Sequence, residues 1–436
     1  MGPIIILDKS TLQSLSDNEL LFLNKYFILN IPPVLVMEIW GDLSKPTKPG
    51  VLSKDRVQNL AQKAHRGQSA INTHFFHCVM ASLLGGKVPM EGRILLPIGN
   101  PRITESGKKG VVFEESPEEK QLNRWKIGDF NSEEQTIAQQ SRATSKAIDL
   151  ESLKKTHQKS FQELTNINSF PPLWSYVNTY LMNPDSQTDF LSQIIEEHKI
   201  SQEFASRIFL RYEQANKPLL SIFAPYAYHC LHVRTFFLLA IIHNLISTRR
   251  TNIIDLEYLY YLPFCMAFAS SDKFHHIMVP YYIRDDQRFV SGTDLKADLT
   301  NLAQEWDVNF HKDMKAWDAK YGSGPPENAN SAIYKLWREL FPKWTPGKKS
   351  YSSHSEPREV NKLNEQMDEF NKAIATQDTD FLSDDSNIDF IVRRYRISID
   401  DPCPCGSGKK LKDCHLPEIR NSQKHTNPTK DEIDEK

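Results

Sequence analysis

The sequence predicts an α/β protein built on a parallel β-sheet with flanking helices, to which a large, mostly helical insertion and a small C-terminal module are added. The first sign is "GPIIILDKS" (2–10), where four apolar residues stop at Asp8. The second is "PFCMAFAS" (263–270), which is followed by Ser271 and Asp272. Unbroken apolar runs are typical of strands buried on both faces, as in parallel sheets, where ligands bind beyond the carboxyl ends of the strands.

The N-terminal elements alternate between strand and helix. Residues 10–27 have helical spacing, with Ser16 or Asp17 as a candidate N-cap. "FILNIPP" (27–33) indicates a second short strand, and "VLVMEIWGDL" (34–43) returns to helical character. This alternation favours parallel strands joined by helices.

After these elements the alternation of strands and helices stops, and it returns near residue 255. A helix from Asp255, the strand that ends before Asp272, a helix over 274–286 and a strand "RFVSGTD" (288–294) restore the α/β pattern. The predicted organisation is a first half of the α/β domain at 1–45, a mostly helical insertion at 46–229, a second half at 230–300, a helical extension at 301–345, a linker and helix at 346–400, a cysteine-rich module at 401–420 and a disordered tail at 421–436.

Composition limits the class of function. The 436 residues carry a net charge of −2 and 39% apolar side chains, so any polyanion site must be local. The most apolar helical stretch, 235–246, is shorter than the ~20 residues that span a bilayer, and the N-terminus lacks signal-peptide features. We therefore expect a cytoplasmic protein without a membrane partner. Cys78, Cys230 and Cys265 are expected to be small core residues.

The C-terminal cysteine cluster has the spacing of a metal site. "DPCPCGSGKKLKDCHLPE" (401–418) contains three thiolates and an imidazole, the four ligands that structural Zn²⁺ requires: Cys403, Cys405, Cys414 and His415. Gly406 and Gly408 permit the tight turn between them. One alternative is a phosphate loop, but the Walker pattern requires glycine at the position of Cys403, so we exclude it. The other alternative is that these are free surface cysteines.

These residues resemble the SEC-C motif, CxCGSGKKxKxC followed by Cys or His. The match includes Lys409, Lys410 and Lys412. The resemblance covers about twenty residues. It implies one zinc ion and a contact module for a ribosome or a protein partner, and it does not imply catalysis.

Four carboxylates are placed where the α/β elements begin or end: Asp8, Glu38, Asp255 and Asp272. Glu38 stands among apolar residues of a helix, which is costly unless the carboxylate is paired or metal-bound, and Asp42 lies four residues further on the same face. If one sheet joins both halves of the chain, these acids meet at its carboxyl edge. Mg²⁺ or Mn²⁺ would neutralise them and could support phosphodiester hydrolysis.

This arrangement resembles the PIN domain, a family of metal-dependent nucleases, many of which cut RNA. The resemblance places the family's acids on Asp8, Glu38, Asp255 and Asp272, with Ser270 two residues before the last of them. It implies one or two bound metal ions, with Ser10 or Ser270 contacting the ligands or a phosphate. This chain departs from the compact domain because 216 residues separate Glu38 from Asp255.

Several weaker signals have two interpretations each. "HFFH" (74–77) and "HCLH" (229–232) fit a second zinc site or aromatic helix contacts. "TRR" (248–250) fits a phosphate contact or a solvated terminus, and "RRYR" (393–396) suits RNA or the ribosome. His275 and His276 could reach a substrate, and Asp294 is an extra acid or a helix cap.

The leading hypothesis is that the protein is a metal-dependent nuclease. We expect an endoribonuclease, and DNA is the other candidate substrate. Asp8, Glu38, Asp255 and Asp272 would be its catalytic metal ligands, and a toxin or defence role would suit such an architecture. The alternative is a non-catalytic adaptor that docks a ribosome, chaperone or protein partner through the zinc module.

Overall fold

The computed structural model describes residues 2–45, 52–96, 100–103, 109–112, 115–147, 149–158 and 167–346. The chain divides into two compact units, residues 1–95 with 115–348 and residues 96–114 with 349–436. The first unit is a mixed α/β body. In the second, β4 (Asn100–Ile103) and β5 (Lys109–Val112) form an antiparallel pair. The predicted linker, zinc module and tail lie outside the described residues.

The first unit is built on a five-stranded parallel sheet in the order β3-β2-β1-β6-β7. Its strands are β1 (Ile4–Leu7), β2 (Ile28–Ile31), β3 (Ser69–Ile71), β6 (Ala267–Ser270) and β7 (Arg288–Ser291). The central strand β1 pairs with β2 on one side and β6 on the other, with Leu7 opposite Ala269. One sheet therefore joins the segments 1–45 and 230–300, which is the condition under which the four acids are expected to meet at its carboxyl edge.

The edge strand β3 comes from the segment 46–229 that the sequence assigns to a helical insertion. It has three residues, of which Ile71 is the buried one, so it is too short to carry a period-2 pattern. The interruption of the sheet therefore falls between β3 and β6, and not directly after residue 45.

The direction in which the chain adds strands reverses beside β1. Strands β1, β2 and β3 extend the sheet toward one edge, whereas β6 and β7 extend it toward the other. The boundary between β1 and β6 is therefore the topological switch point of the sheet, where open α/β folds form a crevice at the carboxyl ends of the strands.

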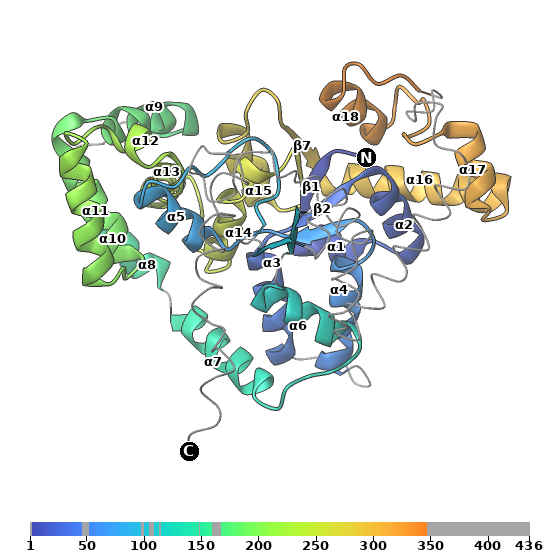
Figure 1. Ribbon diagram of the computed structural model, residues 1–436, viewed down its shortest axis with the longest axis horizontal. Coiled ribbons are helices and arrows are strands. Elements are labelled where there is room, and N and C mark those ends of the chain that lie inside the picture. The colour runs from blue at the N-terminus through green and yellow to red at the C-terminus, as the bar shows by residue number, and fades with distance from the viewer. Residues whose placement is uncertain are drawn as a thin grey trace, which may run out of the picture. The chain divides into compact units, whose positions relative to one another are not determined.

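Helices make up most of the first unit (Figure 1). They are α1 (Lys9–Ser14), α2 (Asp17–Tyr26), α3 (Pro33–Gly41), α4 (Ser53–Ala64), α5 (Phe75–Leu83), α6 (Pro117–Lys126), α7 (Glu134–Ala147), α8 (Leu150–Gln158), α9 (Phe170–Leu181), α10 (Gln187–Glu197), α11 (Gln202–Gln214), α12 (Leu220–Phe223), α13 (Pro225–Ile242), α14 (Asn252–Leu259), α15 (Lys273–Met278), α16 (Gly292–Phe310), α17 (Met314–Tyr321) and α18 (Ala332–Leu340). Ser16 caps α2 in a capping box with Glu19, as the sequence predicts.

Helices α9 to α12 of the predicted insertion and the C-terminal helices α17 and α18 lie at opposite ends of this unit (Figure 1). Helix α13 is buried nearly all round and packs on α5 and α9, so most of the apolar stretch 235–246 belongs to a core helix that ends at Ile242. At the other end α16 packs against α2, and the fully buried Trp317 donates to the Tyr26 hydroxyl at 3.0 Å. No helix in the described ranges has the length and apolarity needed to cross a membrane.

Candidate active site at the switch point

Asp8 is the residue that follows β1, and it caps the N-terminus of α1. Its Oδ1 accepts the Thr11 amide at 2.9 Å, and its Oδ2 lies 2.7 Å from the Ser10 hydroxyl and 2.9 Å from the Ser270 hydroxyl. The amide of Asp8 donates to the carbonyl of Ala269 at 3.2 Å, which continues the β1–β6 pairing. The side chain is 5% exposed, so β1 ends on a buried carboxylate.

Ser270 ends β6 and joins the two strand ends. Its Oγ accepts the Asp272 amide at 3.0 Å and contacts Asp8. Asp272 in turn caps α15 by accepting the Phe274 amide at 2.7 Å. Both aspartates therefore combine a helix-capping bond with a place at the carboxyl end of neighbouring strands.

His275 connects this corner to α14. Its Nε2 lies 2.9 Å from the main-chain oxygen of Asp255, which can only accept, so Nε2 carries a proton. Burial lowers the pKa of His275, which favours the neutral ring with Nδ1 as an acceptor. The single proton of the Ser270 hydroxyl therefore has two acceptors, Nδ1 of His275 at 2.8 Å and Oδ2 of Asp8.

Glu38 extends from α3 toward the same edge. Its Oε2 accepts the hydroxyl of the fully buried Tyr258 at 2.6 Å, and its Oε1 lies 3.7 Å from the Lys9 ammonium. Burial raises the pKa of Glu38, while Lys9 and Tyr258 oppose that shift and Asp8 adds to it. The Tyr258 bond joins α3 to α14 across 220 positions of sequence.

Lys9 and Asp42 form an ion-pair network beside Glu38. The Lys9 ammonium lies 3.1 Å from Oδ1 of Asp42 and 3.5 Å from the main-chain oxygen of Glu38. Asp42, which is 2% exposed, also pairs with Lys45 at 2.6 Å. Although burial by itself lowers the pKa of Lys9, the carboxylates of Glu38 and Asp42 raise it above its ordinary value. Asp42 is thus neutralised by lysines.

Asp255 lies in the first turn of α14. Its Oδ2 is buried and has no hydrogen-bond partner within the described part of the chain. Burial, followed by the charges of Asp272 and Glu38, raises the pKa of Asp255 to about 7, although Arg249 opposes the shift. Burial of a carboxylate oxygen without a hydrogen-bond partner, among like charges, disfavours the charged form of Asp255.

The four predicted acids are therefore electrostatic neighbours: Asp8, Glu38, Asp255 and Asp272. Among the residues that the structure describes, no three His, Cys, Asp or Glu side chains are gathered closely enough to hold a metal ion as they stand. Like-charged carboxylates repel one another, and Asp8, Glu38 and Asp272 are each held by their own hydrogen bonds, whereas Oδ2 of Asp255 is not. The set is brought to one edge of the sheet, but it does not form a closed coordination sphere.

Three further residues belong to this region and were not predicted as part of it. Lys9 and Tyr258 hold Glu38, and Glu257 adds a carboxyl group whose pKa is raised to about 7 by burial and by Glu38. The positions of Lys9, directly after Asp8, and of Tyr258, three residues after Asp255 on a helix, are sequence signals that could have pointed to them.

The histidine pairs are used in packing. His232 lies 3.0 Å from the Tyr282 hydroxyl and 3.2 Å from Oδ1 of Asn178, and His229 lies 3.0 Å from the carbonyl of Leu259. His74 caps α5 through its ring nitrogen. These contacts favour the aromatic-contact interpretation over a second zinc site in the described ranges.

The residues behind the remaining weak sequence signals are exposed on the surface or lie outside the described part of the chain. Arg249 and Arg250 are exposed, and Asp294 is exposed in the first turn of α16. "RRYR" (393–396) lies outside the described residues.

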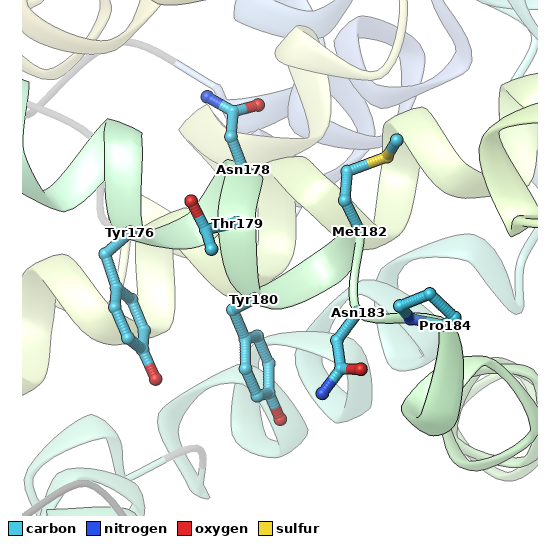
Figure 2. Close-up of a pocket in the computed structure, with 7 residues that line it drawn as sticks. All are labelled: Tyr176, Asn178, Thr179, Tyr180, Met182, Asn183 and Pro184. Atoms are coloured by element: carbon cyan, nitrogen blue, oxygen red, sulfur yellow. The ribbon is translucent and has the colours of Figure 1, made fainter.

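A shallow hollow of about 710 Å³ lies along the end of α9 and contains none of the four acids. Figure 2 shows the rings of Tyr176 and Tyr180 on one side and Asn178 pointing to the other. Asn178 and Thr179 both donate to main-chain oxygens of their own helix. Because its polar groups do not converge, the hollow does not compete with the switch point as a functional site.

Comparison with known families finds the SEC-C motif at residues 401–417, which confirms that prediction. The matched stretch includes Cys403, Cys405, Cys414 and His415. No curated protein and no solved structure matches the chain. No match to a PIN-domain family supports the nuclease resemblance, which stays a prediction.

Proposed function

We propose that this chain is a metal-dependent nuclease that hydrolyses phosphodiester bonds, with RNA as its first substrate, and that its SEC-C motif binds Zn²⁺ and contacts a partner. The observation that carries the proposal is the convergence of acids at the switch point. Asp8 and Asp272 end adjacent strands, while Glu38 and Asp255 come from helices that Tyr258 joins. Bringing like charges together in a partly buried place costs free energy unless hydrogen bonds or a counter-charge offset it, and a bound cation would supply such a counter-charge.

The chemical type of the ligand atoms at this site suits Mg²⁺ or Mn²⁺. Asp8, Glu38, Asp255 and Asp272 offer carboxylate oxygens, the ligands that these hard cations prefer, and Oδ2 of Asp255 is buried without a partner. When bound, such an ion would supply a water of lowered pKa and polarise the phosphodiester. The chain's own part is positional, since Tyr258 and Lys9 hold Glu38 while Ser10 and Ser270 orient Asp8.

The fold also supports the PIN-like interpretation. That resemblance requires a hydroxyl residue and an aspartate at the end of the fourth strand, and β6 is the fourth strand of this sheet in chain order. Ser270 and Asp272 stand at that end. The Glu that it requires after the second strand is Glu38 in α3.

The function is tested by incubating the full-length protein with end-labelled single-stranded RNA and with DNA of the same sequence. We expect internal cleavage of RNA in Mn²⁺ or Mg²⁺ and none in EDTA, because the acids need a cation to act. Gel analysis of fragment lengths distinguishes internal cutting from trimming of the ends. Intact RNA after incubation with folded protein and Mn²⁺ would contradict the proposal.

The proposed binding of Zn²⁺ by the SEC-C motif can be tested separately from nuclease activity. Cys403→Ser is expected to remove the zinc ion from the purified protein, because a four-coordinate site that loses a thiolate ligand binds Zn²⁺ much more weakly. Zinc content per chain is measured by mass spectrometry, with Ser422→Ala, just outside the motif, as the control. Because the five-stranded sheet uses none of the motif's residues, circular dichroism should show its fold retained. Equal zinc content in both variants would refute a Cys₃His site.

A second candidate function is a non-catalytic adaptor that acts through the SEC-C motif. Two observations favour it. The motif is the part of the chain that matches a known family, and the acids do not form a ready coordination sphere in the described residues. Absence of RNA cleavage together with zinc-dependent capture of a ribosome or protein partner would support this alternative.

A further inference from the structure

The loop 243–251, which joins α13 to α14, carries two adjacent arginines, Arg249 and Arg250. Both side chains are exposed, and neither forms a hydrogen bond or an ion pair within the described part of the chain. The loop itself is held by its backbone. The buried Asn252 donates through Nδ2 to the main-chain oxygen of Ser247 at 2.8 Å, and its amide donates to the main-chain oxygen of Arg249 at 3.0 Å. The two guanidinium groups are therefore presented from a fixed loop and are free to bind an anion.

Lys154 of α8 brings a third positive charge to the same loop. Its ammonium lies 2.5 Å from Oδ1 of Asn244, a neutral acceptor, and it forms no ion pair with a carboxylate in the described ranges. Helix α8 packs against α13, the helix that precedes the loop. Since α8 belongs to the segment 46–229, the insertion and the second half of the α/β domain contribute to one group of cations. Lys154, Arg249 and Arg250 are referred to below as the basic surface.

The basic surface adjoins the candidate site. The charge of Arg249 opposes the raised pKa of Asp255, so the two side chains are electrostatic neighbours. They are not paired, because Oδ2 of Asp255 has no hydrogen-bond partner among the described residues. The whole chain has a net charge of −2, so the positive field at this loop is local. A polyanion attracted to it would come to lie beside Asp255.

The chemistry of the three side chains suits a chain of phosphates. A guanidinium group offers a planar fork of N–H donors that binds phosphate through two bonds, and an ammonium group acts as a point charge. Contacts of this kind position a nucleic acid by its backbone and carry no sequence information. A single acidic side chain of a protein partner would engage one of these cations, whereas a polynucleotide backbone repeats its negative charge and can engage all three.

We infer that the basic surface binds the phosphate backbone of single-stranded RNA, and that the helical insertion takes part in this binding through Lys154. The inference rests on the proposed function and goes beyond it, because it locates the path of the substrate beside Asp255 and gives part of the insertion a role.

The inference is tested by fluorescence anisotropy of labelled single-stranded RNA with zinc-loaded, full-length protein. The buffer contains no Mg²⁺ or Mn²⁺, so that binding is measured without cleavage. Each phosphate contact adds about 0.7 to the slope of log affinity against log salt concentration, which is about fivefold in affinity at ~0.1 M salt. The double variant Arg249→Gln/Arg250→Gln should therefore lose about 1.4 of this slope and bind about 25-fold more weakly. Lys154→Gln should lose about 0.7 and bind about fivefold more weakly.

Two further variants are controls. Lys315→Gln/Lys335→Gln removes two exposed positive charges from α17 and α18, at the other end of the unit from α8 (Figure 1), and should keep the wild-type slope. Arg249→Lys/Arg250→Lys keeps both charges and should also keep the slope, although it binds more weakly than the wild type because it lacks the guanidinium fork.

The outcomes separate this inference from the proposed function. Wild-type affinity and slope in Arg249→Gln/Arg250→Gln would overturn the basic surface, and so would an equal loss in Lys315→Gln/Lys335→Gln, whether or not the protein cleaves RNA. Unchanged binding by Lys154→Gln would overturn the role of the insertion. A wild type that does not bind RNA would overturn the whole inference. The expected losses of binding, together with RNA that stays intact in Mn²⁺, would support the basic surface and contradict the nuclease.

Discussion

Asp8→Asn is expected to lower the rate of metal-dependent RNA cleavage by at least about 100-fold. Residues that merely support a metal ligand cost about 10–100-fold when lost, so a direct ligand should cost at least the upper value. Asparagine keeps the shape of Asp8 and can still accept the Thr11 amide through its oxygen, but it loses the charge and the acceptor for the Ser10 and Ser270 hydroxyls. Asp272→Asn should behave alike. Initial rates on labelled RNA at saturating Mn²⁺ give the comparison.

Asp294→Asn is the matched control for these variants. Asp294 is an exposed acid in the first turn of α16, which follows β7 at the same edge of the sheet, and it lies outside the proposed ligand set. Its substitution should leave the rate within about twofold, because exposed side chains away from a site have small effects. Equal activity of Asp8→Asn and Asp294→Asn would show that Asp8 has no catalytic part.

The second prediction with a large expected effect concerns Asp255 and the pH dependence of the free energy of unfolding in the absence of metal ions. The pKa of Asp255 is raised to about 7, above its value near 3.9 in an unfolded chain. The folded protein therefore holds more protons between pH 4 and pH 7, so Asp255 lowers the free energy of unfolding as pH rises through this window. A shift of about three pKa units corresponds to about 4 kcal/mol. Asp255→Asn cannot lose a proton, so it should lack this decline.

The measurement is urea unfolding of wild type and Asp255→Asn at pH 5 and pH 8 in EDTA. The difference between the two proteins cancels groups that titrate in both, such as Glu257, whose pKa is also raised to about 7. Mn²⁺ at pH 8 should stabilise the wild type and have little effect on the variant, because the ion provides the missing counter-charge. Parallel pH profiles would mean that Asp255 is as well solvated in the folded chain as in the unfolded one.

The central strands could be predicted because their sequences are unbroken apolar runs. Ile5, Ile6 and Leu7 are fully buried, and the acid that follows them marks the carboxyl edge. The same pattern located β6 and Asp272. By contrast, β3 is only three residues long and partly buried, so no periodic signal distinguishes it from a loop.

The residues that contact the four carboxylates were harder to predict from the sequence than the carboxylates themselves. Tyr258 reads as one apolar position of a helix, and its bond to Glu38 depends on how α3 and α14 pack, which local pattern does not encode. Lys9 reads as a solvated charge until Asp42 and Glu38 are known to enclose it. His275 is fully buried, with its ring between the Ser270 hydroxyl and the main-chain oxygen of Asp255, although a histidine three residues after Asp272 suggests exposure.

The order of strands along the chain has a consequence for synthesis of the protein. Strand β1 carries Asp8 at the very start of the chain, but its neighbour β6 follows more than 250 residues later. A nascent chain that has produced β1, β2 and β3 therefore holds Asp8 and Glu38 without the strand that brings Asp272 beside them. Contacts of such long sequence separation form late in folding. A growing polypeptide therefore lacks the complete set of acids until translation has passed residue 272, so any cleavage activity would require at least this much of the chain to be synthesised.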